Sequence, residues 1–218
     1  MSRRSLAQYR NLLDDQARIE AAVRAPDGPV LVAYSIKGER GLSLAELQTS
    51  PPLVKHSTET NLECGEGDQC ASRLTAYEVR PGSVALLAVM VGEGPHGQGN
   101  FTSSQAELRM LLTDGFGHPL ELPAAEDSTT AHGVVEESTT LRWVDTSGDG
   151  PAGILALHRA SSEGTLLGND TLPGWSRSSF ELLTFDTVRG AYEEAEIAAE
   201  TPQKELQRLA RGSAFFEY

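Results

Sequence analysis

The predicted fold class rests first on one segment, Gln105-Ala106-Glu107-Leu108-Arg109-Met110-Leu111-Leu112-Thr113. Apolar side chains occupy every second position, at Ala106, Leu108, Met110 and Leu112. The intervening positions include Glu107, Arg109 and Thr113. Because successive side chains of a strand point to opposite faces, this alternation predicts a half-buried antiparallel strand with one face in the core and one in water.

Similar apolar segments on both sides of this strand predict a β-rich core. The further predicted strands are 30–36, 74–79, 83–91, 139–144, 153–159 and 178–186. A turn at 187–190 is expected to lead back into 191–197 and form a hairpin, although the glutamates of that segment also suit a helix. Short strands of this kind imply antiparallel sheets, so the predicted fold class is mainly β and sandwich-like.

A helix is predicted at each end of the chain. The apolar residues near the start share one face at the helical period, namely Leu6, Tyr9, Leu12, Leu13, Ala17 and Val23. Pro26 ends this amphipathic segment, whereas Thr201 and Pro202 suit the start of a short second helix that closes at Gly212. We therefore expect an N-terminal helix over 1–25 packed on one β-rich domain over 29–200, and a C-terminal helix over 201–211.

Composition excludes several classes of partner. The chain of 218 residues has 39% hydrophobic and 22% charged residues, as an ordinary globular protein does. Its net charge of −13 repels phosphate backbones, so we do not expect nucleic acid as a partner. We expect a protein partner instead. The longest apolar run, Val84 to Val91, is far shorter than the roughly 20 residues of a membrane span.

Cys64 and Cys70 lie in the glycine-rich polar segment Glu63-Cys64-Gly65-Glu66-Gly67-Asp68-Gln69-Cys70. A chain that turns back here brings the two side chains within bonding distance, so we predict a small disulfide loop. Two free thiols are the alternative in a reducing compartment. Zinc is a third interpretation, but it needs two further ligands and only His56 is nearby in sequence.

The segment Asp145-Thr146-Ser147-Gly148-Asp149-Gly150 is the strongest candidate for a binding site. Calcium takes about six to eight oxygen ligands, and Asp145, Ser147 and Asp149 offer oxygens at alternate positions around flexible glycines. The carbonyl of Pro151 is placed to add another. The alternative is a simple hairpin turn in which Asp145 and Asp149 cap backbone amides.

This loop and its flanking strands resemble the calcium-loop hairpin of FG-GAP and VCBS-type repeats, as a single degenerate copy over about residues 140–192. The resemblance implies a bacterial, extracytoplasmic protein with calcium-stabilised β structure and a role in adhesion or interaction. Its metal ligands map onto Asp145, Ser147 and Asp149. Ser147 replaces the usual Asn or Asp, and Gly153 stands where the last acidic ligand of the family would be.

No catalytic motif was found in the sequence. The five histidines are not spaced as metal ligands are in known motifs. They are His56, His96, His118, His132 and His158. The leading hypothesis is therefore a non-enzymatic extracytoplasmic binding or structural module with a possible calcium loop. One alternative is an acidic, cytoplasmic inhibitor or immunity-type protein that binds a basic protein, and another is a hydrolase built from dispersed His and Asp residues. The start of the chain leaves open whether an export signal was removed.

Overall fold

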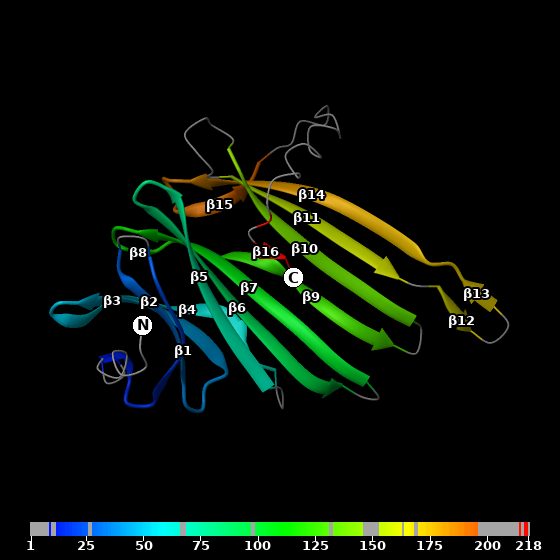
Figure 1. Cartoon of the computed structure of the whole chain (residues 1–218), viewed down its shortest axis with the longest axis horizontal. Coiled ribbons are helices and arrows are strands. Elements are labelled where there is room, and N and C mark those ends of the chain that lie inside the picture. Colours follow the sequence, from blue (N-terminus) through cyan, green and yellow to red (C-terminus); the bar gives the residue numbers. More distant parts are fainter. Residues whose placement is uncertain are drawn as a thin grey trace. The chain divides into compact units, whose positions relative to one another are not determined.

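The computed structural model describes residues 9, 12–25, 28–65, 69–96, 99–130, 133–145, 153–162, 164–167, 170–195, 214 and 216–217. It is mainly β, and its sheets are antiparallel, as the sequence predicts (Figure 1). The chain divides into two compact units. Unit 1 contains residues 1–92, 105–122 and 187–191, and unit 2 contains residues 93–104, 123–186 and 192–218.

The first sheet of unit 1 is a four-stranded meander in the order β1-β2-β3-β4. Its strands are β1 (Ala17–Arg24), β2 (Val30–Ile36), β3 (Gly41–Thr49) and β4 (Pro52–Glu63). The turn between β2 and β3 contains Gly38 at a φ of 94°, a backbone conformation that glycine adopts without steric cost. Short turns of this kind place each strand beside the one before it.

The other strands of unit 1 lie in a second sheet, in which β7, β6 and β5 are neighbours. They are β5 (Gln69–Arg80), β6 (Ser83–His96) and β7 (Gly99–Leu112), and the short β8 (Gly115–Phe116) pairs with the end of β7. The parts of β6 beyond residue 92 and of β7 before residue 105 belong to unit 2.

The main core of unit 1 lies between these two sheets, so the unit is a β-sandwich. Leu31 and Leu44 from the first sheet meet Leu86 and Met90 from β6. All of these side chains are buried, and Leu86 is fully excluded from solvent. The other face of the first sheet is covered by Tyr9 and neighbouring apolar residues in a second cluster.

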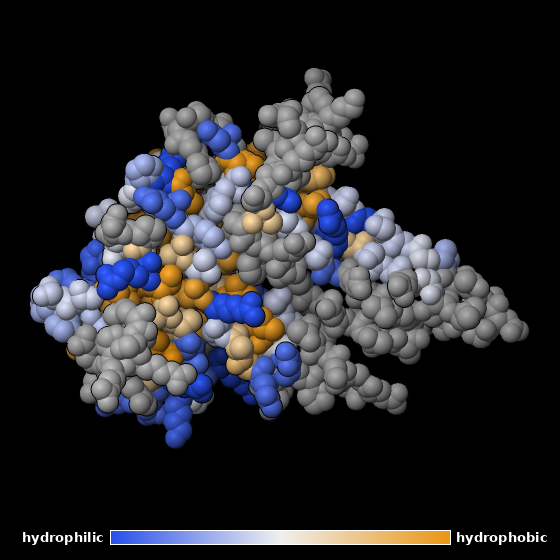
Figure 2. Space-filling model, in the orientation of Figure 1, coloured by the Kyte–Doolittle hydropathy of each residue, from blue (hydrophilic) through white to orange (hydrophobic). Residues whose placement is uncertain are grey.

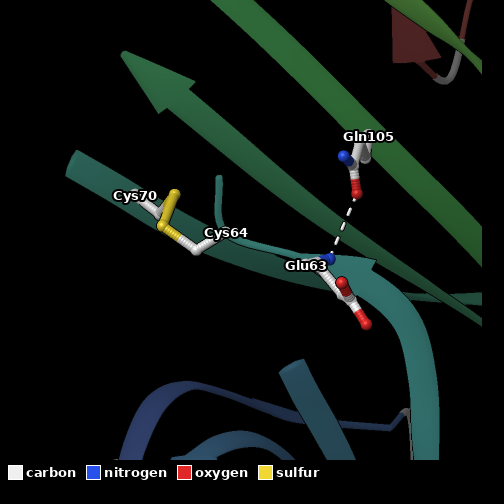
Figure 3. The surroundings of a disulfide bond; sticks show 4 residues. All are labelled: Glu63, Cys64, Cys70 and Gln105. Carbon is white, nitrogen blue, oxygen red and sulfur yellow. Dashed lines mark hydrogen bonds between the residues drawn. A yellow bond between two sulfur atoms is a disulfide. The ribbon is translucent and has the colours of Figure 1, made fainter. Parts of the chain in front are cut away.

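Side chains of β7 cap the outer edge of β4. Glu107 accepts a hydrogen bond from the backbone N–H of Asn61 at 3.0 Å, and Gln105 accepts one from the N–H of Glu63 at 3.2 Å (Figure 3). Arg109 donates to the carbonyl of Glu59 at 2.9 Å. These three side chains lie on one face of β7, because they alternate along it, and they satisfy backbone groups that an edge strand would otherwise expose.

Glu107 and Arg109 are therefore buried, contrary to the predicted wet face of this strand. Their exposed fractions are 1% and 7%, and the guanidinium of Arg109 donates to the carboxylate of Glu107. Arg109 also donates to the hydroxyl of Thr58 at 3.2 Å. The alternation was interpreted correctly as a strand, but its polar face packs against the edge of a second sheet instead of water.

A disulfide joins Cys64 to Cys70, as predicted (Figure 3). Cys64 follows β4 in the first sheet, and Cys70 lies at the start of β5 in the second. The bond therefore closes the connection between the two sheets of the sandwich. Because it uses both thiols, it leaves no thiolate for the zinc site that was considered as an alternative.

Gly117 lies where two backbone segments of unit 1 approach closely. The N–H of His118 donates to the carbonyl of Gly190 at 2.9 Å, and a Cβ at position 117 would lie 2.7 Å from that same oxygen. Any side chain at this position would force the two segments apart, so glycine is required here.

Unit 2 contains a curved antiparallel sheet with the strand order β15-β14-β11-β10-β9 (Figure 1). Its strands are β9 (Leu120–Thr130), β10 (Gly133–Val144), β11 (Gly153–Ser162), β14 (Trp175–Asp186) and β15 (Ala191–Glu194), of which residues 120–122 and 191 belong to unit 1. A short strand, β16 (Phe216–Glu217), also pairs with β10, while β12 (Thr165–Leu167) and β13 (Asp170–Leu172) form a separate pair. The register of β11 on β14 runs without a bulge from Ile154 to Ser162.

The predicted helices are not shown. Residues 17–24, which the N-terminal helix prediction included, form strand β1. The physical reason is strand packing that the prediction passed over. Ala17 and Ile19 pack in the cluster on the other face of the first sheet, and after a β-bulge Ala21 and Val23 pack in the core between the sheets. Residues 1–8 and the predicted C-terminal helix at 201–211 lie outside the described residues. Within the described part of the chain, no helix has the length and apolar character needed to cross a membrane.

Candidate functional site

A pocket of about 370 Å³ lies on unit 2, over the strands β10, β11 and β14. It is lined by Glu137, Ser138, Thr139, His158, Arg159, Ala160, Arg177, Ser178 and Ser179. Each of the three strands contributes three consecutive residues, so the pocket extends across all three strands. It is an open depression that combines cationic, anionic and hydroxyl side chains with apolar surface.

The strand register explains why these side chains meet. Thr139 lies opposite His158, which in turn lies opposite Ser179. Two residues further along, Ala160 is the partner of both Glu137 and Arg177. Because directly paired residues point to the same face of a sheet, these two rows form one continuous surface.

His158 is held on both sides. Its Nδ1 lies 3.0 Å from the hydroxyl of Thr139, and its Nε2 lies 3.4 Å from a carboxylate oxygen of Glu181. In a neutral ring with its proton on Nε2, that nitrogen donates to the carboxylate of Glu181 and Nδ1 accepts from the threonine hydroxyl. These two contacts hold the ring in one orientation.

Arg177 is one of two exposed cations that line the pocket, the other being Arg159. The guanidinium of Arg177 is centred 5.3 Å from the Trp175 ring, a cation–π contact, and lies 3.7 Å from a carboxylate oxygen of Glu137. The side chain is 73% exposed, and Trp175 is one of the few large apolar residues at the surface of the described part, at 44%. With one long ion pair, Arg177 keeps donors that can reach a ligand.

Thr139, His158 and Glu181 place a hydroxyl, an imidazole and a carboxylate in a row. A hydrolytic triad has the same order of groups. Here, however, the hydroxyl belongs to a residue only 4% exposed, and a nucleophile must reach its substrate. The described residues bring no second histidine to this pocket. The geometry therefore suits binding better than hydrolysis.

A second polar group in unit 1 involves Glu46, which is 5% exposed. Lys55 lies 3.2 Å from one of its oxygens, and His56 lies 3.9 Å from the other. One carboxylate and one histidine are too few for a metal site, and no cluster of three or more metal-ligating residues occurs among the described residues. We interpret this group as part of the β3–β4 packing.

The predicted calcium loop lies almost entirely outside the described residues. Asp145 is exposed and follows directly on β10. Ser147, Asp149 and Pro151 are not described. The strands on both sides, β10 and β11, pair as the predicted strand–loop–strand unit requires, so that part of the prediction is confirmed while calcium binding stays a prediction.

Sequence reasoning missed the pocket. His158 was one of the histidines without metal-ligand spacing, and Thr139, Arg177 and Glu181 carried no motif. The signal that could have found them is the pairing register, since one polar residue in each of three neighbouring strands becomes a cluster only when the register is known. A sequence alone does not supply that register.

Comparison with family models, with curated proteins and with solved structures found no match. The resemblance to the FG-GAP and VCBS-type loop therefore remains an expectation from the sequence.

Proposed function

We propose that the protein is a non-enzymatic extracytoplasmic binding module that receives a carboxylate-bearing partner at the pocket of unit 2. The observation that carries this proposal is the exposed guanidinium of Arg177 beside the fixed ring of His158. Arginine offers paired donors that match a carboxylate, and Ser179 adds a hydroxyl on the same face. The half-exposed Trp175 gives the partner an apolar surface next to the charge.

The disulfide supports the extracytoplasmic part of this proposal. Disulfides persist in oxidising compartments and are rare in the cytosol, where thiols stay reduced. The acidic cytoplasmic inhibitor, the alternative suggested by the net charge of −13, would instead have free thiols at Cys64 and Cys70. Hydrophilic residues cover much of the face seen in Figure 2, with apolar areas between them, which is compatible with either partner chemistry.

The pocket is tested with a small dicarboxylate. We expect glutarate, titrated against isotopically labelled protein, to shift the NMR signals of the Trp175 indole and the Arg177 Nε–H. The variant Arg177→Gln removes the cation and should weaken binding at least about tenfold, since charge-assisted hydrogen bonds contribute about 1.5–3 kcal/mol.

The matched control is Arg18→Gln in unit 1. Arg18 is 79% exposed and lies 3.5 Å from Glu20, so it closely copies the exposure and ion pair of Arg177 without the pocket. It should leave the titration unchanged. Equal shifts in the Arg177→Gln variant and the wild type would rule out the pocket as the binding site.

The second element of the proposal is calcium at the Asp145 loop. For a dissociation constant of about 10 µM, adding about 1 mM calcium stabilises the fold by about 2.7 kcal/mol. This shifts the thermal midpoint upward by roughly 5–11 °C relative to excess EDTA. Magnesium is the control cation, and the variant Asp149→Asn should abolish the shift. Identical midpoints in calcium and EDTA would reduce the loop to a hairpin turn.

A further inference from the structure

We infer that the outer edge of β14 pairs with the same edge of a second copy of this chain, forming a continuous sheet across a two-fold axis. The inference rests on the proposed role of Arg177 as a carboxylate-binding residue, and it names the partner that supplies the carboxylate.

The first observation is that this edge is open. One side of β14 pairs with β11 from Trp175 to Leu183. On its other side, β15 pairs only with the C-terminal end of β14. The residues from Trp175 to Ser179 are all exposed, and among the described residues no strand pairs with their outer side. An exposed edge of this length offers unpaired backbone groups to another strand.

The second observation is that Arg177 is the one charged residue on the exposed part of this edge, from Trp175 to Ser179. Monomeric proteins blunt such edges with charged side chains, lysine above all, with proline or with a bulge. β14 contains neither proline nor lysine, and its register on β11 is uninterrupted. The edge of β4 in unit 1 shows how this chain protects an edge, because side chains of β7 occupy its backbone groups there.

The third observation fixes the register. The carbonyl of Leu182 accepts from the N–H of Ala195, so it points away from β11. Every second residue of a strand directs its backbone N–H and C=O to the same side. The backbone groups of Phe180, Ser178 and Ser176 therefore point to the same outer side as those of Leu182. A two-fold axis at Ser178 therefore pairs Ser178 with its own copy and pairs Ser176 with Phe180 of that copy, each pair exchanging two hydrogen bonds.

The fourth observation is charge complementarity in that register. Arg177 then lies opposite Ser179 of the second copy and diagonal to its Glu181, at about 7–8 Å between backbones, within reach of two long side chains. Glu181 already uses one oxygen toward His158, and its other oxygen accepts from the incoming guanidinium. The same contact forms twice because of the two-fold symmetry, which makes the edge self-complementary.

The oligomeric state tests this inference. Sedimentation equilibrium of the full chain at about 0.15 M NaCl should show a monomer–dimer equilibrium. The variant Ser178→Pro removes an outward N–H, which a proline on an edge strand tolerates without loss of the ladder to β11. It should raise the dimer dissociation constant at least about tenfold while keeping the wild-type circular dichroism spectrum.

Cross-linking locates the interface. Hydrogen-bonded antiparallel partners lie about 5.5 Å apart, which suits a disulfide, so Ser178→Cys should form a covalent dimer under mild oxidation. The control is Ser57→Cys on β4, an exposed strand serine in unit 1. A wild-type chain that stays monomeric, or equal cross-linking of the two variants, would overturn the inference. If the monomer still binds glutarate through Arg177, the proposed function survives that failure.

Discussion

Replacing Arg109 by methionine should lower the free energy of unfolding by about 3–5 kcal/mol, because removing one member of a buried ion pair leaves the other charge uncompensated. The charge left behind is Glu107, which is 1% exposed. The variant also loses the hydrogen bond from Arg109 to the carbonyl of Glu59, so part of the cap on the β4 edge is lost. Urea unfolding measures the change, with the slope checked for constancy.

Two further variants separate the causes of this loss of stability. Glu107→Gln in the Arg109→Met background removes the uncompensated charge and should recover part of the loss, so the two substitutions are not additive. The matched control is Arg18→Met, which breaks an exposed ion pair with Glu20 and should cost at most about 1 kcal/mol. If Arg109→Met unfolds at the same urea concentration as Arg18→Met, the buried network contributes no stability.

The same two residues show how far the sequence can predict this fold. Alternation over 105–113 predicted the strand correctly, since the period of two is a property of the chain itself. It did not show that Glu107 and Arg109 are buried, because a polar face looks the same whether it contacts water or the backbone edge of another sheet. That distinction depends on β4, whose contacts with these two residues span 46 and 50 positions of the sequence and are made by the tertiary fold.

Residues 17–24 show a second limit. Ala17 and Val23 fit a helical face, but they also fit a strand, since both spacings occur in the same short segment. Pairing with β2 decided the outcome, through a register that runs from Ala17 to Arg24 with one shift between Ile19 and Ala21. The pocket escaped prediction for a related reason, because His158 and Arg177 become neighbours only through the register of β10, β11 and β14. The Cys64–Cys70 bond, by contrast, depends on local spacing and was predicted.

Replacing Leu86 by alanine should lower the free energy of unfolding by about 2–5 kcal/mol. Leu86 is fully buried in β6, between the two sheets of unit 1, where it belongs to the same cluster as Leu31 and Leu44. The loss combines the transfer energy of the deleted carbons with the cavity that remains, and well-paired strands on both sides limit how far that cavity can collapse. Urea unfolding again gives the magnitude.

Hydrogen exchange then locates the loss. The cavity lies in the core of unit 1, so the amides of β2, β3 and β6 are the ones to follow. If these amides exchange only when the whole unit unfolds, their free energy of opening should fall by about as much as the free energy of unfolding. The control is Leu12→Ala, the same chemical change at a leucine that is 46% exposed, and it should cost less than about 1 kcal/mol. Similar losses for the two variants would contradict a tightly packed interface between the sheets, because the cost of deleting a leucine side chain should follow its burial.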